Sequence, residues 1–295
     1  MLKKSEEKTG VLLVLISVFF FGLQPIVTKY TVKTINPLFL GTMSVFFGLI
    51  IPMLVLIKRK KVKTLIEKEN ILYLFFIAFF GSVFAFGLLF IGAKMTSGIN
   101  VSLLLQSEPL YATFIGFFIL KESISKKQFF AMFMIIIGMS VILYNGTLSI
   151  NYGDILILLT PVGWQISHTI VKKVIKKIET YTIVTGRFLY AFPVFLFLST
   201  LFGSNQFEVL IVPFYFGLIL FIGISEILGY IFWIEALKRI NLSKATTLVS
   251  PYPMLSLIFA WFILSELPSI YQIIGLISVL IGIYIIGRVK SEIRK

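Results

Sequence analysis

The segment INVSLLLQSEPLYATFIGFFILKES, residues 99–123, places a glutamate and a proline in the middle of an apolar run. The rest of residues 99–120 is apolar enough to lie in lipid, and a membrane span needs about 20 such residues. A carboxylate at the centre of a bilayer costs about 2.5–3.5 kcal/mol on insertion scales. Glu108 and Pro109 are therefore tolerable only where they face protein or a watery cavity. We expect a bent membrane helix at this position.

The composition of the whole chain is that of a membrane protein. Of its 295 residues, 58% are hydrophobic and 14% are charged, whereas soluble domains carry about 25% charged residues. The chain has no cysteine, which excludes disulfides, thiolate metal sites and cysteine nucleophiles. Its single histidine, His168, excludes a metal centre with several histidine ligands. We predict neither a metal nor a cofactor.

Apolar segments bounded by charged residues, Pro, Gly or Asn recur along the chain, each long enough for a transmembrane helix. They cover roughly residues 10–28, 37–57, 71–93, 98–120, 127–145, 153–171, 180–200, 211–236, 242–264 and 270–288. The sequence therefore predicts an all-α polytopic membrane protein with ten transmembrane helices.

Basic residues lie almost entirely on one side of this arrangement. Of the 27 lysines and arginines, all but Lys29, Lys33, Lys94 and the intramembrane Arg187 fall in the termini and the even-numbered loops. Such asymmetry marks the cytoplasmic side, so both termini are predicted to lie inside the cell, with the protein in the plasma membrane. The net charge of +14 is then a topology signal and a lipid contact, and we expect no nucleic-acid partner.

The two halves of the chain resemble each other. A shift of 144 residues matches several polar and small residues in fixed order, namely Pro109/Pro253, Glu122/Glu266, Gln128/Gln272 and Gly138/Gly282. We predict one repeat over residues 1–146 and a second over residues 147–295. Because each repeat holds an odd number of spans, the second must be inverted relative to the first. Inverted repeats place a shared cavity at the midplane, where the two halves can rock.

The repeated segment AKMTSGINVSLLLQSEPLYATFIGFFILKESISKKQFFAMFMIIIGMSVIL, residues 93–143, resembles the repeat of the EamA-type transporters of the drug/metabolite transporter superfamily. Its small-residue helix start, mid-span proline, glutamate at the end of the fourth span and glycine in the fifth fit that pattern, as does GRFLY at residues 186–190. The resemblance covers nearly the whole chain and implies a ten-helix transporter. Substrates of that family range from amino acids and amines to sugars and nucleotides. The halves also differ, since Ser44 stands where the second half has Arg187.

Polar and aromatic residues inside the predicted spans are candidates for binding the solute. They are Glu108, Glu226, Tyr230, Trp164, His168, Arg187, Tyr190 and Gln24. Glu226 and Tyr230 share one stripe of their helix with Gly229 and Trp233. An acid beside aromatic faces suits an organic cation or an amino group.

Glu108, Glu226 and His168 are also candidates for carrying protons, because burial disfavours the charged form of a carboxyl and histidine titrates near neutral pH. Alternatives stay open: Glu108 can be a neutral hydrogen-bonded group, and His168 a neutral donor packed between helices. Arg187 is always charged and needs a carboxylate partner or an anionic solute, unless it snorkels.

Three prolines are predicted helix breaks, namely Pro109, Pro251 and Pro253. Pro109 lacks an N–H, so the carbonyl of Leu105 is expected to lose its intrahelical donor. Glu122 and Glu266 end the fourth and ninth spans at opposite surfaces, and we interpret them as gating or structural residues.

We expect a secondary transporter, with export favoured, that moves a small metabolite, amino acid or amine-like solute by alternating access around a midplane cavity. Proton coupling is one way to drive it, since no Walker motif is present. A non-transporting receptor or accessory subunit is the alternative, and an intramembrane enzyme is less favoured because Asp154 is the sole aspartate. The expected partners are the solute and the lipid bilayer, and the expected assembly is a monomer or weak homodimer.

Overall fold

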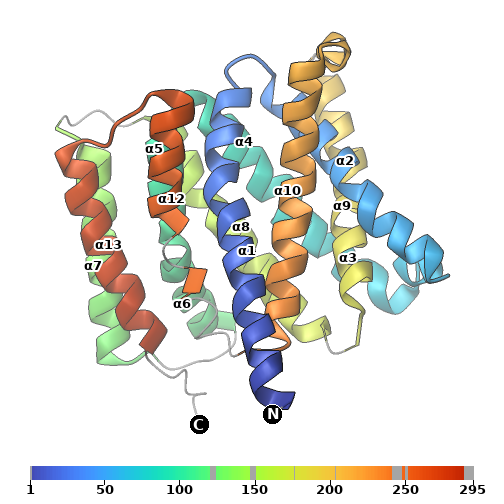
Figure 1. The fold of residues 1–295 in the computed structure, drawn as a ribbon, viewed down its shortest axis with the longest axis horizontal. Coiled ribbons are helices and arrows are strands. Elements are labelled where there is room, and N and C mark those ends of the chain that lie inside the picture. Colours follow the sequence, from blue (N-terminus) through green and yellow to red (C-terminus); the bar gives the residue numbers. More distant parts are fainter. Residues whose placement is uncertain are drawn as a thin grey trace.

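A computed structural model of the protein describes residues 2–119, 124–146, 151–175, 177–202, 204–240, 248–249 and 252–288. Within these residues the protein is a bundle of helices (Figure 1). In the part of the chain that the structure describes, nine helices are long and apolar enough to cross a membrane, and a shorter apolar helix covers Tyr252–Leu264. The prediction of an all-α polytopic membrane protein with about ten membrane helices is confirmed.

The fourth and third predicted spans each consist of two α-helical pieces joined by an irregular turn. In chain order the elements are α1 (Leu2–Thr31), α2 (Pro37–Lys58), η1 (Val62–Leu65), α3 (Lys68–Ala78), η2 (Phe79–Phe84), α4 (Ala85–Met95), α5 (Gly98–Leu104), η3 (Leu105–Ser107), α6 (Glu108–Ile119), α7 (Lys126–Tyr144), α8 (Tyr152–Val174), α9 (Thr180–Leu201), η4 (Phe207–Ile211), α10 (Pro213–Leu237), α12 (Tyr252–Phe259), η5 (Ala260–Leu264) and α13 (Ile270–Arg288). The turns η2 and η5 are π-helical, and η1, η3 and η4 are 3-10 turns.

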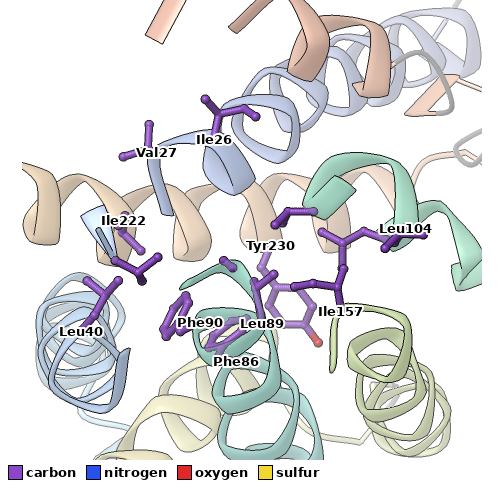
Figure 2. Close-up of a cluster of buried hydrophobic side chains, with 14 of the residues drawn as sticks. Ile26, Val27, Leu40, Phe86, Leu89, Phe90, Leu104, Ile157, Ile222 and Tyr230 are labelled. Carbon is purple, nitrogen blue, oxygen red and sulfur yellow. The ribbon is translucent and has the colours of Figure 1, made fainter. Parts of the chain in front are cut away.

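Helices pack in pairs that relate the two halves of the chain. α1 packs on α10, α4 on α8, α2 on α9, and α7 on α13, which lie side by side at one edge of the molecule (Figure 1). The counterparts of α1 and α10 in the other half are α8 and α4, so the pair α1–α10 corresponds to the pair α8–α4. In the pairs α2–α9 and α7–α13, each helix is the counterpart of its own partner. The core between them is apolar: Figure 2 shows Leu40 of α2, Phe86 and Phe90 of α4 and Ile222 of α10 gathered together.

Glycines set the close approach of α7 and α13. A Cβ at Gly138 would lie 2.6 Å from the Gly275 carbonyl oxygen, and one at Gly282 would lie 2.7 Å from the Ala131 carbonyl oxygen. Residue numbers rise along one helix as they fall along the other, so the two helices run antiparallel. This is the relation that an inverted repeat requires of the last helices of its halves.

Gly138→Ala is expected to destabilise the protein, because the new Cβ meets backbone of α13 and the two helices must move apart. Overpacking of this kind costs about 1–3 kcal/mol. The matched control is Gly217→Ala in α10, where a Cβ would have nothing within 4 Å. Thermal unfolding in detergent checks this: a Gly138→Ala protein as stable as the Gly217→Ala protein would contradict the close packing.

The backbone hydrogen bonding is less interrupted at Pro109 than the sequence predicts. The Leu105 carbonyl was expected to lose its donor, but it accepts the N–H of Glu108 in η3. The helix compensates for the missing proline N–H by winding to a 3-10 turn, which bonds one residue earlier. In the second half, Pro253 is the second described residue of α12, and residues 250–251 before it lie outside the described part of the chain. Pro251 lies outside the described residues, as does Glu122.

Candidate functional site

Glu226 is a buried carboxyl on α10, 7% exposed, that faces α1. The antiparallel packing of these helices brings Gln24 opposite to it, and the Gln24 side-chain amide donates to Glu226 Oε1 over 2.6 Å. The other oxygen, Oε2, is buried and has no hydrogen-bond partner among the described residues. One oxygen of this carboxylate is therefore fixed by Gln24, and the other has no partner among the described residues.

Tyr230 follows Glu226 by one helical turn and connects it to two other candidates. The Arg187 guanidinium carbon lies 4.6 Å from the centroid of the Tyr230 ring. The His168 ring stacks on Tyr230 with centroids 6.1 Å apart and planes at 16°. The Tyr230 hydroxyl is buried without a partner in the described part of the chain, within the same apolar cluster as Ile157 (Figure 2).

Arg187 is held by neutral groups. It is 5% exposed; its Nε donates to Ser82 Oγ over 2.9 Å and its terminal nitrogen to the Gly81 carbonyl over 2.6 Å, both in the π-helical turn η2. Phe86 lies 5.2 Å from the guanidinium. No carboxylate of the described residues forms an ion pair with Arg187. A buried charge without a paired counter-ion is costly.

Glu108 forms the accessible end of this group. The Gln165 amide of α8 donates to Glu108 Oε1 over 2.5 Å, and His168 Nδ1 lies 3.9 Å from the same oxygen. The side chains of Glu108 and His168 remain 31% and 30% exposed. We call Gln24, Glu108, Gln165, His168, Arg187, Glu226 and Tyr230 the central cluster. It connects a partly exposed carboxyl with a buried one through His168 and Tyr230.

Buried polar atoms without partners surround the central cluster. In the described residues these include Trp164 Nε1, Gln106 Nε2 and Ser107 Oγ. An unsatisfied buried polar group costs about 1–3 kcal/mol. Gln106 and Ser107 were not among the residues expected from the sequence, although they directly precede Glu108 in the 3-10 turn.

Other residues predicted for the site lie elsewhere. Tyr190 shares a helix face with Arg187, but its hydroxyl donates to the Leu65 carbonyl over 2.8 Å, beside η1. Glu266 Oε2 accepts the backbone N–H of Ile99 over 3.0 Å at the start of α5. The structure therefore brings together Gln24, Glu108, His168, Arg187, Glu226 and Tyr230, with Trp164 in the helix that carries His168, and leaves Tyr190 and Glu266 apart from them.

The surroundings of Tyr230 change which group of the central cluster a cationic solute would contact. The ring of Tyr230 is already contacted by Arg187 and His168. A cationic solute would find its partner in the carboxyls rather than in the Tyr230 face, since a second cation over that ring would be repelled by Arg187.

The chain is similar to known membrane proteins over nearly its whole length. The model of the EamA-like transporter family matches residues 8–144 and again residues 151–288. The chain is 26% identical over 269 residues to "Uncharacterized transporter YyaM" of Bacillus subtilis (strain 168), covering 86% of each chain. It is 24% identical over 285 residues to "Uncharacterized transporter YoaV" of the same strain, covering 93% of this chain and 95% of that protein.

Among solved structures, a crystal structure of another protein has the same fold. It aligns with a TM-score of 0.68 at 15% sequence identity, over 94% of this chain and 96% of the other. At this identity the likeness concerns the fold alone.

Proposed function

The chain belongs to the EamA-like transporter family, and from this premise we propose that it exports a small amine-bearing solute, such as an amino acid, by alternating access around the central cluster. As a member of that family it is a membrane transporter and not an enzyme. The family match also disfavours a receptor that does not transport.

The observation that carries the proposal is the half-satisfied carboxylate of Glu226. One of its oxygens is bonded to Gln24 and the other is buried without a partner. A solute ammonium or a proton at Oε2 would satisfy that oxygen, and charge-assisted hydrogen bonds are about twice as strong as neutral ones. A sugar hydroxyl would gain less from the same position.

Arg187 favours a solute that also carries an anionic group. Its described hydrogen-bond partners are neutral, so a carboxylate entering the site would compensate a buried charge. An amino acid supplies both groups. Its ammonium would bind Glu226, and its carboxylate would bind the guanidinium beside Tyr230.

Proton exchange would drive the cycle. Burial disfavours the charged form of a carboxyl, so an empty site favours a protonated Glu226, whereas a bound ammonium favours the ionised form. Glu108 is more accessible than Glu226 and would exchange its proton first. Solute and proton thus compete for the same oxygens, which is the basis of an antiport.

The experiment is a flux assay in proteoliposomes with an imposed pH gradient. Vesicles are loaded with labelled amino acids, amines, sugars or nucleotides, and solute efflux and internal pH are recorded together. We expect amine-bearing solutes to leave as protons enter. Equal flux of solutes that lack an amine, or binding with no flux, would overturn the proposal.

The proposed topology has both termini in the cytoplasm and residues 145–152 outside, with residues 1–146 and 147–295 as inverted repeats in the plasma membrane. The strongly unequal distribution of lysine and arginine supports it. A reporter fused after Ser291 is expected to be active only as a cytoplasmic fusion, and one inserted in residues 145–152 only as an external one. The opposite pattern would refute the orientation.

A further inference from the structure

Side chains of α5, α8 and α13 form a hydrogen-bonded chain at the end of the molecule where α4 ends. Asp154, at the start of α8, accepts on Oδ1 from the Thr96 hydroxyl and from the Asn100 amide, the latter over 3.1 Å. Gln272, in the first turn of α13, donates to Asn100 Oδ1 over 2.7 Å. Asp154 is 4% exposed and Gln272 is 5% exposed. These hydrogen bonds therefore tie the first half of the protein to the second through buried groups.

A second contact closes the same end. Glu266 Oε2 accepts the N–H of Ile99 over 3.0 Å, across the two halves. A Cβ at Gly98 would lie 2.2 Å from a Leu264 methyl carbon and 3.3 Å from Glu266 Oε2. A larger residue at position 98 would require the Leu264 side chain to shift.

Burial differs sharply along the fourth span. From Gly98 to Ser107 every residue except Asn100 is buried, whereas from Glu108 to Ile119 only Gly116 is buried. A helix with lipid on one side and protein on the other shows a buried stripe at every third or fourth residue. α6 lacks such a stripe, and residues 108–113 are only half-buried, so the face that it turns to the rest of the protein is partly accessible.

We infer that Thr96, Asn100, Asp154, Gln272 and Glu266 form a latch that holds one end of the transporter shut, while access to Glu108 runs along α6 from the opposite end. Opening the latched end requires breaking the Thr96–Asp154, Asn100–Asp154, Asn100–Gln272 and Ile99–Glu266 bonds, because each of them joins the first half to the second. The inference rests on the proposed alternating access.

The two ends use different chemistry. Under the repeat, Gln272 corresponds to Gln128, but Asp154 corresponds to Val11, which has no acceptor. At that end Arg239 instead pairs with Glu235 over 2.9 Å and with Glu6 over 3.1 Å. Asp154 therefore makes the latch specific to one end, and an identical closure cannot form at the other.

Gln272→Glu is the sharpest test, since it removes one donor and keeps the helix cap. Gln272 Oε1 accepts the N–H of Ser269, which glutamate can also do, but a carboxylate opposite Asn100 Oδ1 and near Asp154 is repelled. Gln128→Glu is the matched control, because Gln128 makes the same cap with Ser125 and is 8% exposed.

The readout is a distance between the two halves. The chain has no cysteine, so cysteines placed at Met95 of the first half and Leu267 of the second, which are 47% and 72% exposed beside the latch, take spin labels at those two positions only. We expect the ratio of long to short distances to rise about fivefold in Gln272→Glu and in Asn100→Ala, with Gln128→Glu unchanged.

Unchanged distances in both latch variants, or an equal change in Gln128→Glu, would overturn the latch. Asn100→Ala keeps the test valid where Gln272→Glu fails to fold. The distances are measured without solute or gradient, so a failed amine or proton assay would refute the proposed function and leave this result standing.

Discussion

In proteoliposomes, Glu226→Gln is expected to lower solute-driven proton flux about tenfold or more. Glutamine has nearly the shape of glutamate but cannot take up and release a proton. In the native protein Glu226 Oε1 is held by Gln24, and Oε2 is buried without a partner among the described residues. The variant therefore loses proton uptake and release at Oε2. Glu108→Gln is expected to act in the same direction but more weakly, because the 31% exposed Glu108 side chain can be assisted by water.

Solute exchange is scored separately from proton flux in the same vesicles. The matched control is Glu208→Gln, which removes an exposed carboxylate from η4 and should leave both signals unchanged. If Glu108→Gln and Glu226→Gln both keep wild-type coupling and affinity, the two glutamates are packing residues and proton exchange at them is wrong.

Arg187→Gln is expected to weaken the binding of amino acids about 10–100-fold, the value of a charge-assisted hydrogen bond. It should change the binding of the corresponding decarboxylated amines much less. The reason is that the guanidinium is the cation that would meet a solute carboxylate. Arg187→Lys is expected to fail as well, since an ammonium cannot reach Ser82 and the Gly81 carbonyl as a planar fork while lying over Tyr230.

Thermal stabilisation in detergent by an amino acid and by its amine measures this discrimination without any flux. Tyr190→Phe is the control on the same face of α9, because it removes a hydrogen bond to Leu65 outside the central cluster. It should lower stability slightly and keep the discrimination. An Arg187→Gln protein that still prefers the amino acid would show that Arg187 is structural.

The family resemblance and the all-α membrane fold with about ten helices could be predicted from the sequence, and both are confirmed. A membrane makes this possible, because each lipid-exposed span must satisfy its own backbone hydrogen bonds, so apolar length alone predicts a helix. The repeated glycine pair Gly138/Gly282 was also visible, and the structure places both glycines at the contact of α7 and α13. The local winding at Pro109 was not, since a 3-10 turn preserves a bond that the sequence predicts to be lost.

The sequence by itself determined which segments are apolar helices of membrane-spanning length and which polar residues within them need a partner. Only the tertiary structure decided the partners: Glu226 meets Gln24 from α1, and Glu108 meets Gln165 from α8. Arg187 and Tyr190 share a face, yet one reaches η2 and the other η1. Partners separated by many residues depend on how each helix is rotated and which helix packs beside it. Hydrophobicity leaves the rotation of a helix undetermined, because in lipid a span can be apolar on every side. Close contacts such as those of Gly138 and Gly98 fix the rotation instead.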